Sequence, residues 1–111
     1  ISMLNRSAVV VRPKQPFVDW LKSVKELELP DMTLDQLEKT LYLVPDYEDP
    51  GDAEKVLKKV CDEIFCRELE GWYTDEETWP KNRSLKVFEQ WFDVEHFDVV
   101  EDVGRAPIMD D

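Results

Sequence analysis

Apolar and polar positions along the 111-residue chain follow two periods, and the changes between them predict the elements. Residues 7–12 contain an apolar run with three consecutive β-branched valines and no alternation, which is typical of a central strand or of a strand buried on both faces. From Phe17 to Val24 apolar residues recur at helical spacing, and Pro16 suits the first turn of that helix. The pattern therefore predicts a strand followed directly by an amphipathic helix.

The longest helical pattern covers residues 53–72, with Asp52 as its expected N-cap and Gly71 as its expected end. Shorter helical segments are predicted at 33–37, at 74–77 and after Asn82 or Ser84, and further strands at 41–44 and 95–103. The predicted order is β, α, α, β, α, α, β. These elements indicate the α+β class, with a three-stranded sheet packed against about four helices.

The predicted organisation is one domain over residues 1–103 and a loose tail over residues 104–111. The helical connections are long enough to join strands in parallel by right-handed crossovers. The pattern leaves the strand order and the direction of the last strand open, and it says nothing of the oligomeric state.

Charge narrows the range of partners. The chain holds 26 acidic and 14 basic residues, a formal net charge of −12. Such a surface argues against nucleic-acid binding through a general basic patch and favours a basic protein partner. No apolar run reaches the roughly 20 residues of a membrane span, so we expect no membrane partner and a cytoplasmic location.

The positive charge is concentrated at the start of the chain, where residues 1–25 carry a net charge of +4. Arg12 and Lys14 lie where the first strand meets the N-terminus of the first helix, a position that attracts anions through free N–H groups and the helix dipole. They are the candidate residues of a small anion site. The alternative is that they pair with surface carboxylates such as Asp46.

A second candidate surface is aromatic. Tyr73 and Trp79 stand outside the main periodic stripes and are expected to be exposed, and Arg83 follows them in the sequence. Tyrosine, tryptophan and arginine are enriched in the contacts that dominate protein interfaces. Tyr73, Trp79 and Arg83 are therefore the candidate interaction residues.

Catalytic and metal-binding motifs are missing from the sequence, and we assign no catalytic residue, no metal and no cofactor. Cys61 and Cys66 diverge on one helix, and His96 is the only histidine. An enzyme would have to be built around His96, with Asp98 orienting it and Cys66 brought in by folding. The acidic residues of 46–52 are read as a turn and helix cap rather than as a cation site.

Several short segments resemble a family of small bacterial proteins of unknown function: Asn5 to Leu21, Gly71 to Asp75, Trp79-Pro80, Asn82-Arg83 and Trp91 to Asp93. The resemblance implies no activity. Three hypotheses follow from the residues: a non-catalytic interaction module with a basic partner, which leads, an anion-binding or regulatory protein using Arg12 and Lys14, and a minimal enzyme around His96.

Overall fold

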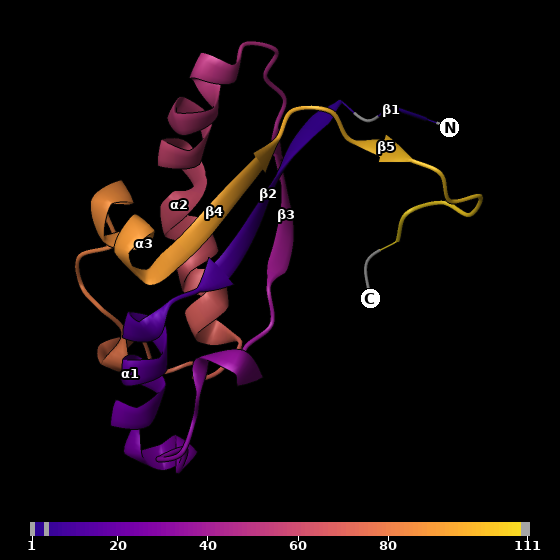
Figure 1. Cartoon of the computed structure of the whole chain (residues 1–111). Helices are drawn as coiled ribbons and strands as arrows, with labels where there is room; N and C mark the ends of the chain where they lie inside the picture. The colour runs from indigo at the N-terminus through magenta and orange to yellow at the C-terminus, as the bar shows by residue number, and fades with distance from the viewer. Residues whose placement is uncertain (1, 4, 110–111) are drawn as a thin grey trace.

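The computed structural model describes residues 2–3 and 5–109. Within them the chain forms the strands β1 (Ser2–Met3), β2 (Arg6–Pro13), β3 (Thr40–Pro45), β4 (Phe92–Phe97) and β5 (Glu101–Asp102), and the helices α1 (Gln15–Ser23), α2 (Ala53–Glu70) and α3 (Leu85–Trp91) (Figure 1). Single 3₁₀ turns lie at Lys25–Leu27, Leu34–Gln36, Pro50–Asp52 and Glu76–Thr78. The predicted α+β class is confirmed.

β2, β3 and β4 form a three-stranded sheet in the described chain, in the order β3-β2-β4, with β2 antiparallel to both neighbours. The expected parallel crossovers are therefore wrong. α1 continues beyond the end of β2 instead of packing back along the sheet, and the chain returns so that Thr40 lies opposite Val11 (Figure 1). β3 thus begins where β2 ends, which imposes the antiparallel direction.

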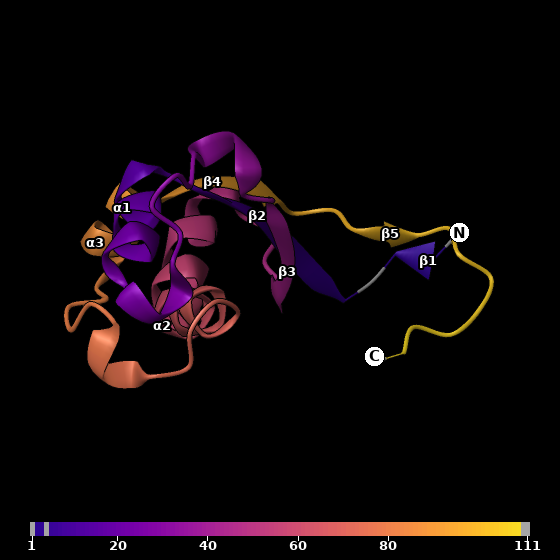
Figure 2. The same ribbon diagram turned by 90° about the horizontal axis from the view of Figure 1, so that it is seen from below.

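β4 begins directly after α3, with Phe92 opposite Pro13 and Phe97 opposite Ala8. The predicted strand over 95–103 was placed too late and is interrupted. Beyond Phe97 the chain leaves the sheet, and Glu101–Asp102 pairs instead with Ser2–Met3 in a separate two-stranded ribbon. Figures 1 and 2 show this ribbon projecting from the body of the molecule. The radius of gyration is 15.6 Å, against about 13 Å for a compact domain of this length.

The helices gather on one side of the sheet, with α2 behind it in Figure 1 and beneath the strands in Figure 2. Between them lie four fully buried phenylalanines, Phe17, Phe65, Phe88 and Phe92. The ring of Phe92 lies 5.5 Å from Phe17, 5.3 Å from Phe65 and 4.9 Å from Phe88, measured between centroids. These contacts join all three helices to the start of β4, and aromatic pairs at such separations are favourable.

Helix boundaries follow local chemistry. The Ser84 hydroxyl accepts the Val87 N–H at 3.4 Å and caps α3, so of the two predicted caps, Asn82 and Ser84, it is Ser84 that caps the helix. Asp52 stands at the N-cap of α2 but makes no capping hydrogen bond, and its carboxylate lies 3.5 Å from Lys55 Nζ. The helix predicted at 33–37 is only the 3₁₀ turn Leu34–Gln36, where Gln36 Oε1 accepts the Thr33 N–H at 3.0 Å.

Among the described residues, no helix is long and apolar enough to cross a membrane.

Candidate functional site

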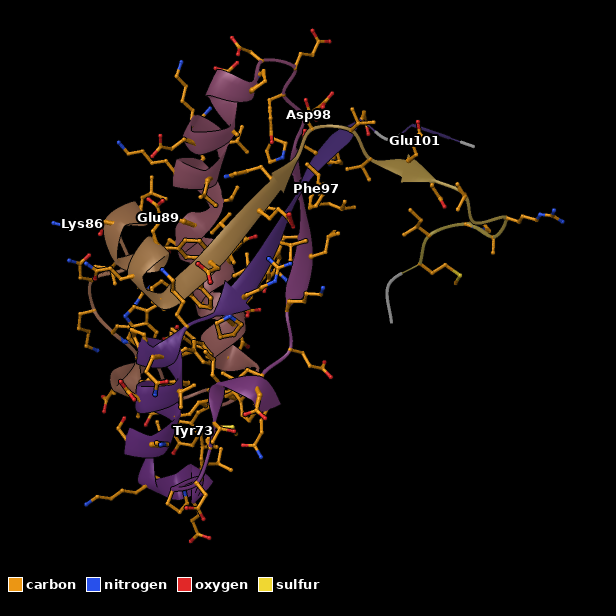
Figure 3. All side chains as sticks on the ribbon, in the orientation of Figure 1. Tyr73, Lys86, Glu89, Phe97, Asp98 and Glu101 are labelled. Atoms are coloured by element: carbon orange, nitrogen blue, oxygen red, sulfur yellow. The ribbon has the colours of Figure 1, made fainter. Side chains whose placement is uncertain are left out.

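One face of the sheet is not covered by any helix of the described chain, and we call it the open face. Because paired residues of an antiparallel sheet point to the same side, the register assigns every second residue to this face. One row across the strands is Leu43, Ala8 and Phe97, and the next is Leu41, Val10 and Glu95. In Figure 3 Phe97 lies at the end of β4, next to Asp98.

The apolar side chains of this face are exposed to solvent. Leu41 is 56% exposed, Leu43 is 49% exposed and Phe97 is 40% exposed. Ala8, between Leu43 and Phe97, is buried although no helix of the described chain covers it, because larger side chains flank it. A contiguous exposed apolar patch on a sheet is a signature of an interaction site.

The open face becomes charged toward the end of β2. Arg12 Nη2 lies 3.6 Å from Glu95 Oε2, and Asp93 stands opposite Arg12 in the register. Lys14 Nζ lies 3.7 Å from Asp93 Oδ1 and donates a hydrogen bond to the Glu89 carbonyl at 2.9 Å. Both cations of the proposed anion site therefore have carboxylate partners.

The anion hypothesis expects free N–H groups at the start of α1, but the Phe17 N–H donates to the Lys14 carbonyl at 3.0 Å. The alternative partner Asp46 is at the opposite end of the strand from Arg12 and accepts from the Ser7 hydroxyl at 3.4 Å. Anion binding by Arg12 and Lys14 stays a prediction.

A pocket of about 650 Å³ adjoins the charged end of the open face. Leu34 and Leu37, from the 3₁₀ turn and the residue after it, form its apolar part; its other lining residues are Arg12, Pro13, Glu38, Lys39 and Asp93. We call it the first pocket. Since it shares Arg12 and Asp93 with the open face, the two form one continuous surface.

A second pocket of about 390 Å³ lies between the start of β3 and the end of α2. It shares Pro13, Leu37 and Glu38 with the first pocket and is completed by Gln36, Thr40, Arg67, Glu68, Gly71 and Trp72. Trp72 is 38% exposed. The two pockets therefore lie side by side, separated by the chain that leads into β3.

Glu68 is the unusual group of the second pocket. Its carboxylate accepts a short hydrogen bond from the Tyr42 hydroxyl. Burial raises the pKa of Glu68, while favourable contacts with the Tyr42 and Thr40 hydroxyls act in the opposite direction. Burial and the neighbouring Glu68 likewise raise the pKa of Tyr42. Glu68 is thus a half-buried carboxylate held by hydroxyl groups.

The aromatic candidates are arranged differently from the expectation. Trp79 is only 6% exposed, because its ring lies in the core and its Nε1–H donates to the Tyr73 carbonyl at 2.9 Å. The expected exposure of Trp79 is therefore wrong. Tyr73 is half-buried and packs against the core, and of the tryptophans it is Trp72 that is exposed.

Arg83 is held within its own chain. Its Nε donates to Asp62 Oδ1 at 2.8 Å and its Nη1 to the Pro80 carbonyl at 2.9 Å. The hydrogen bond with Asp62 raises the pKa of Arg83. An interaction role for Tyr73, Trp79 and Arg83 stays a prediction. The side chain of Trp79 is buried in the core and presents little surface to a partner.

His96 and Cys66 do not meet in the structure. His96 lines a pocket of about 610 Å³ with residues from the start of α2, including Glu54 and Leu57. Cys66 is nine residues beyond Leu57 on α2, about 13 Å along the helix axis, and it neighbours Arg83. The described part of the chain holds no group of three or more His, Cys, Asp and Glu residues suited to a metal ion.

Both cysteines are free thiols. Burial is the largest cause raising the pKa of Cys61 and of Cys66. Burial therefore disfavours the thiolate, which is the reactive form of cysteine.

No family model matches the chain, and no curated protein or solved structure matches it either.

The sequence analysis did not identify this surface. The sequence does show that Leu41 and Leu43 alternate with Tyr42 and Val44, which point toward the helices. Apolar residues therefore occupy both the odd and the even positions of this strand. Such a strand is apolar on both sides. The exposed side can be recognised only when the position of the helices is known.

Proposed function

We propose that the chain is a non-catalytic protein-interaction module that binds a basic protein partner through the open face of its sheet. The observation that carries the proposal is the exposure of three large apolar side chains on this face, those of Leu41, Leu43 and Phe97. Leaving these side chains in water is unfavourable, and a partner that covers them recovers that free energy.

Charge supports the choice of partner. The chain has a formal net charge of −12. On this face the carboxylates of Asp93 and Glu95 are paired with Lys14 and Arg12, and further carboxylates, those of Asp98 and Glu101, follow beyond the end of β4 (Figure 3). A partner with an apolar centre and a basic rim would complement both features and would be steered toward the face before contact.

The first pocket supplies a place for an anchor. Interfaces draw most of their affinity from a few side chains that insert into pockets near the contact. The pocket combines Leu34 and Leu37 with the stem of Arg12 at the margin of the open face. A single apolar side chain of the partner would be desolvated there.

Anion binding and catalysis have less support. Arg12 and Lys14 already contact Glu95 and Asp93, and exposed ion pairs of this kind form readily without a ligand. His96 lies away from Cys66, so the nucleophile and base of the proposed enzyme are not adjacent.

The test is a quantitative capture experiment from the source cells with three tagged proteins: the wild type, Leu43→Lys and Gln90→Lys. Both variants add one positive charge at an exposed position, but Gln90 is on α3, away from the open face. We expect a stoichiometric basic protein with the wild type and with Gln90→Lys, and its loss with Leu43→Lys.

Two outcomes contradict the proposal. One is a partner that Leu43→Lys retains with unchanged affinity while the variant unfolds like the wild type. The other is a stoichiometric partner that is acidic, since charge would then oppose the association.

A further inference from the structure

The second pocket contains a carboxylate, that of Glu68, which has hydroxyl neighbours but forms no ion pair among the described residues. In the five ion pairs found within the described residues, Glu68 takes no part. Arg67 is adjacent in sequence and lines the same pocket, yet its Nε lies 3.5 Å from Glu63 Oε2. The polar partners of Glu68 are therefore the uncharged Tyr42 and Thr40 hydroxyls.

Removing a carboxylate from water is costly, and an opposite charge brought close to it recovers part of that cost. Hydroxyl donors hold the carboxylate in place without neutralising it. A cation entering the pocket would gain a charge-assisted hydrogen bond at a group whose geometry is already fixed by Tyr42.

The remaining lining suits a long cationic side chain. Trp72 lies four residues after Glu68, and its exposed indole borders the same cavity. An indole face attracts ammonium and guanidinium groups. Pro13 and Leu37 provide apolar surface for the methylene stem. At about 390 Å³ the cavity is within the usual range of ligand pockets.

We infer that this second pocket receives the side chain of a lysine or arginine from the basic partner, with Glu68 binding the charged head and Trp72 stacking on it. The inference rests on the proposed function for the source of that side chain. Because Pro13, Leu37 and Glu38 line both pockets, a partner that reaches the first pocket from the open face has the second pocket beside it.

The site is tested without the partner, with three small probes: lysine, arginine and norleucine, each acetylated at the α-amino group and amidated at the carboxyl group, so that the side chain is unmodified. Norleucine keeps the four-carbon stem of lysine but has no charge. We expect the NMR signals of the Trp72 indole N–H and the Gly71 amide to shift with the two cationic probes at millimolar concentration, and not with norleucine amide. Absence of a shift, or equal shifts with all three probes, overturns the inference.

Matched variants identify the groups. Glu68→Gln preserves the size of the side chain and its contact with Tyr42 but removes the charge, and should weaken cation binding by about tenfold. Glu70→Gln, at an exposed position of the same helix and outside the pocket lining, should leave it unchanged. Trp72→Ala should weaken binding of the arginine probe as well. If Glu68→Gln binds the cations as tightly as the wild type, the inference is wrong.

The two proposals fail separately. If the probes do not bind but Leu43→Lys still abolishes partner capture, the pocket inference falls and the interaction module stands. If the probes bind at Glu68 but no partner depends on Leu43, the cation pocket stands and the proposed function falls.

Discussion

The two faces of the sheet are built from the same strands with the same two-residue period, but they have different surroundings. On the covered face Val9, Val11 and Phe92 are almost completely buried under the helices. On the open face Leu41, Leu43 and Phe97 retain between 40% and 56% of their exposure. The apolar residues of the covered face are buried by the chain's own helices, whereas those of the open face remain in contact with water.

This difference in burial suggests that the covered face stabilises the fold and that the open face binds a partner. The covered face, with the four buried phenylalanines, holds the molecule together, because apolar burial is the dominant stabilising contribution. The open face adds little to the stability of the isolated chain, since its side chains remain in water. We therefore expect substitutions on the covered face to affect unfolding, and those on the open face to affect binding.

The largest expected effect is on the covered side. Leu57 lines the small space beneath Val9 and Val44, and Leu57→Ala should lower the free energy of unfolding by about 2 to 5 kcal/mol because it leaves a cavity. Leu43→Ala should cost less than about 1 kcal/mol, since its side chain is half-exposed. Urea unfolding measures both. Equal losses would mean that the open face is covered in solution.

The two cysteines of α2 also differ in burial, and substituting them should have unequal but smaller effects on the free energy of unfolding. Cys61 is buried in the core and Cys66 is only half-buried. Cys61→Ser should cost about 1 to 3 kcal/mol, because it places a hydroxyl group in an apolar environment. Cys66→Ser should cost clearly less. If the order of the two midpoints in urea is reversed, the assignment of α2's buried side is in error.

Salt separates the two contributions of the open face. The association rate with the basic partner should fall by about tenfold between low and physiological ionic strength, because screening removes the steering by carboxylates. Leu43→Ala should instead increase the dissociation rate. Stopped-flow kinetics distinguishes the two effects. An association rate that does not change with salt would leave the apolar rows as the source of affinity and remove the charge argument.

The smallest expected effect concerns Glu68, at the margin between the faces. Its pKa is raised from 4.5 in the folded state, so above that value the folded chain binds more protons than the unfolded chain and stability falls as pH rises. Gln cannot titrate. Relative to the wild type, Glu68→Gln should therefore gain stability as the pH rises above 4.5, until the folded-state carboxyl is ionised. A relative loss over that range would show that the carboxylate is better solvated when folded.

Local sequence patterns were sufficient to predict the α+β class, the helix α2 and a cap of α3 at Asn82 or Ser84, because these depend on contacts a few residues apart. The direction of β3 could not be predicted, since it depends on α1 continuing past the sheet rather than folding back on it. The burial of Trp79 also depends on a distant element, because its neighbour Trp20 closes the same region by donating to the Thr78 carbonyl.

The open face was missed for a related reason. The central residues of β2 are apolar at both odd and even positions. This pattern predicts a central strand but does not indicate which face of the sheet the helices cover. Arg12 and Lys14 were correctly identified as cations at the junction of β2 and α1, yet their partners Glu95 and Asp93 come from a strand some 80 residues later in the sequence.

The central claim is tested most directly by NMR cross-saturation in the complex with the captured partner. Saturation applied to the partner should transfer to the methyl groups of Leu41 and Leu43 and should not reach Leu57 or Val9 beneath the covered face. Saturation of other surface methyls, with those of Leu41 and Leu43 unaffected, would contradict the assignment of the open face as the contact surface.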